Sequence, residues 1–177
     1  LHAIPRRQRQ MCIRDRYDAA CIVDELENIH FLQRPMVCRD ITDNREMDYN
    51  TVYACCAGTK KHVGTSFTEP SFVPDAIEML HLIAGGEQSW RERPFVSNSN
   101  CFVVPPMKFA TESCQVMEAC IEAGMPILLL SAGQAGATAP APIAGAIVQA
   151  VAECLAGLVY VHSVSYTHLT LPTRNCV

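Results

Sequence analysis

Short apolar segments recur at a constant interval along this chain, and the interval limits the folds that it can adopt. Segments typical of buried strands begin near His62, Pro94, Pro126 and Leu158, each 32 residues after the one before. A further segment, residues 34–41, lies one slightly shorter step upstream. Because runs of about four to eight apolar residues are typical of strands buried on both faces, we predict strands at these five positions.

Helical patterns fill the intervals between these segments, and each pattern is followed by a glycine that can end a helix. The patterns cover residues 73–84, 114–121 and 147–155, and the glycines are Gly85, Gly124 and Gly157. Strands that alternate with helices form parallel sheets with right-handed crossovers. The even spacing favours a (β/α)8 barrel over a doubly wound sheet. About five strands are too few to close a barrel, so the predicted fold is α/β, a partial barrel of TIM type.

The two ends of the chain carry an unusual relationship at the level of DNA. The segments "MCIRDR" and "VSYTHL" can be back-translated into strings that are reverse complements over most of their length, and these resemble the transposase end sequence of sequencing libraries. A fold has no reason to encode such an inverted repeat. We therefore interpret residues 1–16 and 163–177 as non-native, adaptor-derived tails. Residues 17–162 are then the barrel fragment.

Composition excludes several classes of protein. The chain is 49% hydrophobic and 18% charged with a formal charge of −4, which argues against nucleic-acid or anionic membrane partners. Every apolar run is interrupted before the roughly 18 residues of a membrane span. The ten cysteines form no C-x-x-C pair and no cluster with zinc-ligand spacing. We expect a cytoplasmic protein with reduced cysteines and no bound metal.

Uncharged polar residues follow the predicted strands, where parallel α/β folds place their binding sites. We call these ten candidate substrate-binding residues the predicted rim: Ser66, Phe67, Ser97, Asn98, Asn100, Phe102, Ser131, Gly133, Gln134 and Thr138. A rim with few formal charges suits a small polar or cationic ligand, and the two phenylalanines are candidates to hold a quaternary cation. Turn formation, helix capping and lid packing remain structural alternatives for these residues.

The glycine-containing loop at residues 131–138 does not match a phosphate-binding motif. It has neither the lysine and spacing of a Walker loop nor the G-x-G-x-x-G pattern of a dinucleotide site. Gly133 and Gly136 still allow backbone to approach a ligand closely. A substrate pocket wall and a compact turn without a ligand are the two interpretations left open.

Three segments closely resemble the trimethylamine methyltransferase family: "RPFVSNSNCFVVPPMKF", "YACCAGTKKHVGTSF" and "MPILLLSAGQAGATAPAPIAGAIVQAVAECLAGLVYV". The resemblance covers essentially all of residues 17–162. It implies a (β/α)8 barrel that moves a methyl group from a methylated amine to the Co(I) of a corrinoid, a cobalamin carried by a partner protein. Some members carry pyrrolysine and use trimethylamine, whereas others take quaternary amines such as glycine betaine. The pyrrolysine-equivalent position is expected downstream of residue 162, so the amine is left open.

The residues of the predicted rim are compatible with this chemistry. Loss of a methyl group from a quaternary ammonium releases a neutral amine, so no general acid is required, and positioning with desolvation is the protein's main task. Catalytic residues are not identified. The fragment alone is expected to be inactive, and the full-length enzyme could form a homo-oligomer. A barrel of the same family that binds or senses a methylated amine without methyl transfer is the alternative.

Overall fold

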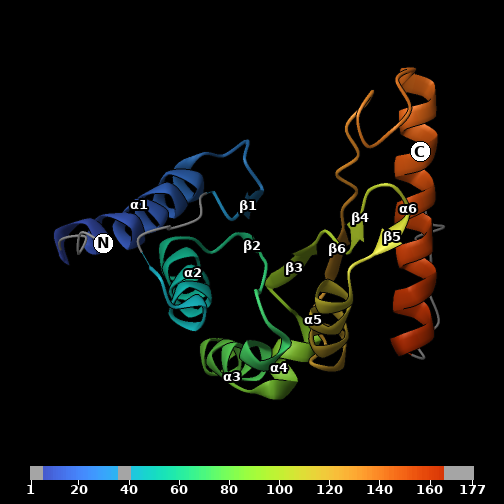
Figure 1. Ribbon diagram of the computed structural model, residues 1–177. Helices are drawn as coiled ribbons and strands as arrows, with labels where there is room; N and C mark the ends of the chain where they lie inside the picture. Colours follow the sequence, from blue (N-terminus) through green and yellow to red (C-terminus); the bar gives the residue numbers. More distant parts are fainter. Residues whose placement is uncertain (1–5, 36–40, 166–177) are drawn as a thin grey trace. The chain divides into compact units, whose positions relative to one another are not determined.

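The computed structural model describes residues 6–35 and 41–165, and these divide into two compact units. Unit 1 comprises Leu1–Asn100 and Thr111–Leu128, and unit 2 comprises Cys101–Ala110 and Leu129–Val177. Figure 1 shows the helices and strands of both units.

Unit 1 is built on a parallel sheet whose strands follow one another in chain order. The sheet order is β1 (Phe31–Gln33), β2 (His62–Thr65), β3 (Val96–Asn100) and β6 (Ile127–Leu129). The helices of unit 1 are α1 (Arg6–Glu25), α2 (Asn44–Gly58), the 3-10 turn η1 (Pro70–Phe72), α3 (Val73–Ala84), α4 (Glu87–Glu92) and α5 (Thr111–Glu122). The prediction of an α/β fold with a parallel sheet is therefore confirmed.

One face of this sheet forms the hydrophobic core of unit 1. The strand register aligns Leu32 with Val63 and Val63 with Val96, and all three side chains are buried in the core. Trp90 of α4 is fully buried there, and its Nε1 donates a hydrogen bond to the carbonyl oxygen of Ala123 at 3.1 Å. Because side chains alternate along a strand, the intervening residues lie on the opposite face of the sheet.

Two helices of unit 1 end at or near the glycines that the sequence predicted as helix ends. Helix α3 covers Val73–Ala84 and ends at Gly85, whose φ of 85° is left-handed. Helix α5 ends near Gly124, which has a φ of 71°. Asp43 caps α2, because its side chain accepts a hydrogen bond from the backbone N–H of Glu46 at 2.9 Å.

One of the five predicted strands is corrected by the structure. Strand β1 lies at Phe31–Gln33, and the strand predicted at residues 34–41 falls mostly on residues 36–40, which lie outside the described part of the chain. The strand predicted near Leu158 is wrong, because α6 (Ile143–Ser165) continues as helix through that position. Gly157 does not end this helix; it packs against the ring of Phe102 instead. A short apolar run alone does not distinguish a strand from a helix.

Unit 2 consists of a short hairpin, the end of β6, a loop and α6. The antiparallel strands β4 (Val103–Val104) and β5 (Lys108–Phe109) form the hairpin, which sequence patterns did not predict. The ring of Phe109 lies between those of Phe102 and Tyr160, with centroid distances of 5.4 and 6.0 Å. These three aromatic rings join the hairpin to α6.

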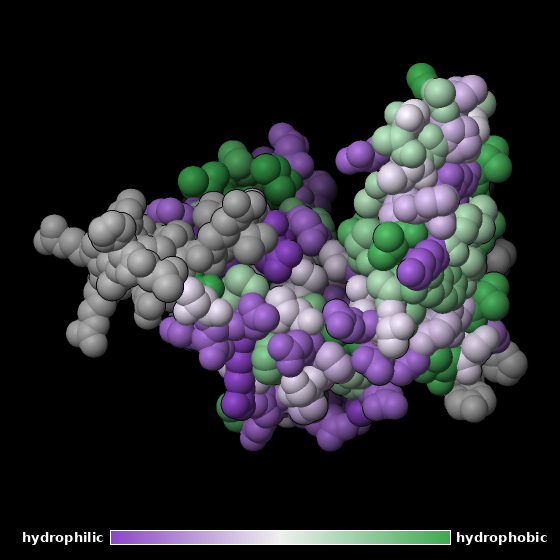
Figure 2. Space-filling model, viewed as in Figure 1, coloured by the Kyte–Doolittle hydropathy of each residue, from purple (hydrophilic) through white to green (hydrophobic). Residues whose placement is uncertain are grey.

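Helix α6 presents most of its apolar side chains to solvent. The large apolar residues of the helical pattern at residues 147–155 are exposed in this structure: Ile147, Val148, Val151 and Leu155. Apolar surface runs along this helix in Figure 2. By length and composition alone α6 could cross a membrane, so the expectation that no segment reaches that length is corrected. Its buried Glu153 argues against that placement, because a carboxylate is costly at the centre of a bilayer.

Seven cysteines are free thiols among the residues whose side chains the structure describes. Six lie in helices, at Cys21, Cys55, Cys56, Cys114, Cys120 and Cys154. Burial raises the pKa of Cys56 and of Cys120 to about 12, so both are protonated at neutral pH. These side chains act as small apolar groups.

Candidate functional site

Half of the predicted rim follows β2 or belongs to β3 in unit 1. On the face of the sheet opposite the core, a hydrogen bond joins the Oγ of Ser97 to Nε2 of His62 at 2.9 Å. Ser99 Oγ donates to Gln33 Oε1 at 2.8 Å on the same face. The ring of Phe31 stacks on His62 at a centroid distance of 5.5 Å. Ser97 therefore belongs to a hydrogen-bonded layer that crosses three strands.

Gly64 makes this layer possible. A β-carbon at residue 64 would lie 2.1 Å from Gln33 Oε1 and 2.6 Å from the ring of Phe31. The side chains of β1 therefore lie across the backbone of β2 at this point. This close approach explains why the central strand carries a glycine here.

The two asparagines of the predicted rim lie on the other face, beneath the helices. Asn100 Nδ2 donates to the carbonyl oxygen of Ser113 in α5 at 2.9 Å, so it braces a helix. Asn98 is fully buried, and neither polar atom of its side chain has a partner within the described residues. Its register partner Thr65 has a buried hydroxyl that is likewise unpartnered there. These groups are not on the face that carries Ser97.

Ser66 and Phe67 come directly after β2. Phe67 is 8% exposed and belongs to the core of unit 1, whereas Ser66 is half-buried. Nearby, Asp48 of α2 is fully buried and accepts hydrogen bonds from the N–H and hydroxyl of Thr68. Burial raises the pKa of Asp48, and the Thr68 bonds and the charge of Arg34 only partly oppose that shift. Binding of a cation by Phe67 stays a prediction.

Four residues of the predicted rim follow β6 and lie in a compact loop of unit 2: Ser131, Gly133, Gln134 and Thr138. The carbonyl oxygen of Gln134 accepts hydrogen bonds from three successive N–H groups, those of Ala137, Thr138 and Ala139. The hydroxyl oxygen of Thr138 accepts from the N–H of Gln134 at 2.9 Å. Gly136 takes a left-handed φ of 81° at the tip of this turn. The loop is therefore braced by its own backbone.

Glu153 of α6 holds this loop from the helix side. Its Oε2 accepts a hydrogen bond from the hydroxyl of Ser131, at the start of the loop. Its Oε1 accepts from the backbone N–H of Met107 in the hairpin and from Nε2 of Gln149, each at 3.0 Å. Gln149 Nε2 also donates to the carbonyl oxygen of Thr138 at 2.9 Å, which fixes the far end of the loop.

The electrostatics of Glu153 are set by this arrangement. The side chain is 1% exposed. Burial acts to raise its pKa, but the hydrogen bonds from Ser131, Met107 and Gln149 outweigh burial and hold the pKa below the ordinary value. Glu153 is therefore ionised at neutral pH. Met107 has a left-handed φ of 58°, which is uncommon for a residue with a side chain.

Phe102 and Gly133 of the predicted rim both lie in unit 2. Phe102 is fully buried within unit 2, where its ring packs on Gly157 and Phe109, and its role toward a cation stays a prediction. A β-carbon at Gly133 would lie 3.3 Å from that of Ala139, so the residue fits a tight turn. Ser131, Gln134 and Thr138 thus come together, whereas Asn98 and Phe67 are separated from Ser97.

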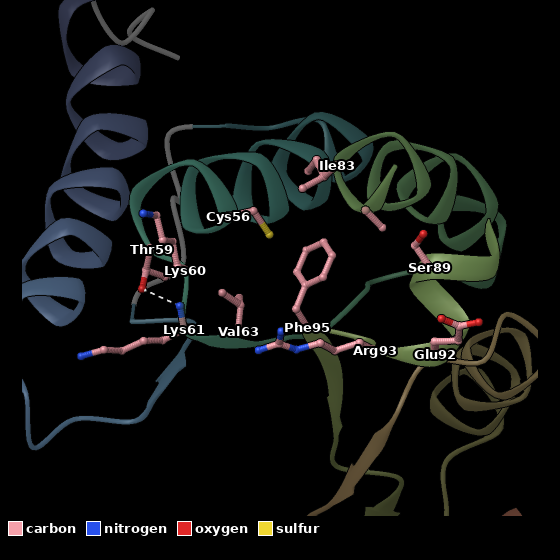
Figure 3. Close-up of a pocket in the computed structure, with 11 residues that line it drawn as sticks. Cys56, Thr59, Lys60, Lys61, Val63, Ile83, Ser89, Glu92, Arg93 and Phe95 are labelled. Atoms are coloured by element: carbon pink, nitrogen blue, oxygen red, sulfur yellow. Dashed lines mark hydrogen bonds between the residues drawn. The ribbon is translucent and has the colours of Figure 1, made fainter. Parts of the chain in front are cut away.

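A cavity of about 610 Å³ lies at the amino-terminal ends of β2 and β3, whereas the predicted rim was placed at the carboxyl ends of the strands. In Figure 3 the side chains of Cys56, Ile83 and Phe95 surround it, with Val63 and Arg93 along the lower edge. No residue of the predicted rim lines this cavity. Among the described residues, no group of three His, Cys, Asp or Glu side chains could hold a metal ion.

Comparison with known proteins assigns the family. The family model described as trimethylamine methyltransferase (MTTB) matches residues 2–167, which is most of the chain. The chain belongs to the trimethylamine methyltransferase family. The resemblance noted from sequence segments is thereby confirmed.

Curated members of the trimethylamine methyltransferase family match at moderate identity. The trimethylamine methyltransferase MttB1 of Methanosarcina mazei is 30% identical over 80% of this chain and 28% of its own length. MttB of Desulfitobacterium hafniense is 27% identical over 85% of this chain and 30% of its own length. A glycine betaine methyltransferase of the same species is 32% identical over 51% of this chain and 19% of its own length. The chain therefore spans less than a third of the relatives that it matches.

Sequence reasoning found the loop of this family member but missed the helix residues that hold it. Gln149 and Glu153 lie one helical turn apart on α6, so both reach the same loop. Glu153 is the single Asp, Glu, Lys or Arg residue between Ile143 and Ser165. A lone charge in an otherwise apolar helix was the signal available, because buried carboxylates require hydrogen-bond donors.

Proposed function

We propose that this chain is part of a methyltransferase that moves a methyl group from a methylated amine to the Co(I) of a corrinoid held by a partner protein. Membership of the trimethylamine methyltransferase family carries the proposal. The relatives are named as trimethylamine and glycine betaine methyltransferases, so the substrate class is a tertiary or quaternary methylated amine.

The described residues fit a reaction that needs positioning more than acid–base catalysis. In the transfer the carbon–nitrogen bond breaks and its electron pair stays on nitrogen. The methyl group forms its new bond with an electron pair from the Co(I) acceptor. For a quaternary amine the leaving group is neutral and needs no proton. The loop of Ser131, Gln134 and Thr138 offers fixed backbone and hydroxyl groups, which suit orientation of a substrate.

The strand order supports a partial TIM-type barrel. In the sheet β1-β2-β3-β6 each strand pairs beside its predecessor along this sheet, without the reversal of order that marks a doubly wound fold. The core side chains of the first three strands lie under helices, and the opposite face carries the His62–Ser97 layer. We infer that this layer faces the inside of a barrel in the whole protein. We also expect the whole protein to work in the cytoplasm.

The proposal is tested with a full-length protein that carries this chain. The purified protein is mixed with cob(I)alamin and with trimethylamine, glycine betaine or carnitine in turn. We expect one methylated amine to yield methylcobalamin, which is followed by its absorption spectrum. Omission of the protein is the control. Binding of an amine without formation of methylcobalamin, also when a corrinoid protein is added, would favour the alternative of a binding or sensing role.

A further inference from the structure

The buried carboxylate of Glu153 is bound entirely by neutral groups in the described part of unit 2. Its hydrogen-bond donors are a backbone N–H from Met107, a hydroxyl from Ser131 and an amide from Gln149. They reach it from the hairpin, the loop and the helix. None of these donors cancels its formal charge, so a net negative charge remains inside unit 2.

The loop that Glu153 holds contributes no other formal charge. Residues 130–142 contain no Asp, Glu, Lys or Arg. A negative charge in surroundings of low dielectric acts over several ångströms, because water does not screen it. Burial of such a charge is unfavourable, and a nearby cation offsets part of that cost. A ligand bound against this loop would therefore gain more from a positive charge than a neutral ligand of the same shape.

We propose that Glu153 is a positioning and specificity-determining residue: it fixes the Ser131–Thr138 loop, and its charge makes the site prefer a ligand with a fixed positive charge. This inference rests on the proposed function, since it assumes that this loop faces the methylated amine. It deepens that function by naming the residue that distinguishes an ammonium group from an uncharged group of equal size. Glu153 acts through the loop and through its field, without contact to the ligand.

Two probes of equal shape isolate the charge. Glycine betaine carries a trimethylammonium group, and 3,3-dimethylbutanoate has a carbon atom in place of the nitrogen. Affinities of both are measured by isothermal titration on a full-length protein that carries this chain. For the native sequence we expect glycine betaine to bind about tenfold tighter or more, the scale of one ion-pair interaction across several ångströms.

Variants then separate charge from position. Glu153→Gln removes the charge at nearly constant volume, and we expect the affinity ratio of the two probes to fall to about threefold or less. Ser131→Ala breaks the loop contact but keeps the charge, so both affinities should weaken together with the ratio retained. Glu78→Gln, at an exposed position on α3, makes the same change of charge and should leave both affinities unchanged.

The outcomes are distinct. An unchanged ratio in Glu153→Gln would overturn the inference while leaving the proposed function intact. Should that variant fail to fold, Glu153→Asp decides, because it keeps the charge and must keep the ratio; its loss would overturn the inference. The proposed function itself would be refuted by a native protein that binds neither probe and that forms methylcobalamin from none of the amines tested.

Discussion

The ring of Phe102 lies directly against Gly157 of α6, and there is no room for a β-carbon between them. Such an atom at residue 157 would be 2.3 Å from Cζ of Phe102, whose side chain is fully buried. On helix propensity alone, alanine would stabilise this position by about 1 kcal/mol. We expect the opposite result, a destabilisation of about 1–3 kcal/mol for Gly157→Ala, because overpacking displaces the ring. Urea unfolding followed by far-UV circular dichroism measures the change.

A second substitution shows whether the ring is the cause. Phe102→Leu gives a smaller side chain opposite residue 157, so Gly157→Ala should cost less in that background. The coupling energy from the double-mutant cycle is expected to be about 0.5–3 kcal/mol. Equal costs in both backgrounds would show that Phe102 does not limit the space.

Trp90 supplies the largest fully buried side chain of unit 1. Trp90→Phe removes the hydrogen bond to Ala123 and part of the packing on Phe95, whose ring centroid lies 5.5 Å away. We expect a loss of about 1–3 kcal/mol for this change and about 3–5 kcal/mol for Trp90→Ala. Denaturant unfolding by circular dichroism provides the values. Tyr53→Ala, at an exposed position of α2, is the control and should change stability little.

Arg16 has a buried guanidinium that is only partly satisfied. Its Nη1 donates to Thr51 Oγ1, whereas Nε and Nη2 have no partner within the described residues. Replacement of a poorly paired buried charge by an apolar side chain is often stabilising. We expect Arg16→Met to raise the free energy of unfolding by about 1–3 kcal/mol. A lower stability in the same urea assay would show that the Thr51 contact outweighs the unpaired nitrogens.

The fold was predictable where local chemistry decides it, and the failures have physical causes. Gly85 with a left-handed φ ends α3 as its pattern indicated, because glycine adopts that conformation readily. The run at Leu158 failed because the same apolar residues fit a strand or a helix, and packing of Gly157 on Phe102 is not visible in a sequence. The link between Glu153 and Met107 joins residues 46 positions apart, which no local pattern reports.

The exposed apolar side chains of α6 predict self-association of this chain. Ile143, Val148 and Val159 are 75%, 69% and 65% exposed, and large exposed apolar patches favour aggregation. We expect a variant with Val148→Lys and Val159→Lys to have a lower sedimentation coefficient at equal concentration. Its helix content should be unchanged, since both side chains point to solvent. A chain that is monomeric before substitution would contradict this expectation.

The pH dependence of stability should report the carboxylate of Glu153 directly. Its pKa in the folded chain lies below the ordinary value of 4.5, so its stabilising contribution is complete above that pH and is lost as pH falls through the folded-state pKa. The free energy of unfolding of the native chain minus that of Glu153→Gln should therefore be constant near neutrality and shrink in acid. Ser131→Ala removes one of the hydrogen bonds that lower this pKa, so the contribution should disappear at a higher pH in that background. Urea titrations at a series of pH values test both statements. A difference that stayed the same from neutral pH down to about pH 3 would mean that folding does not lower the pKa of Glu153.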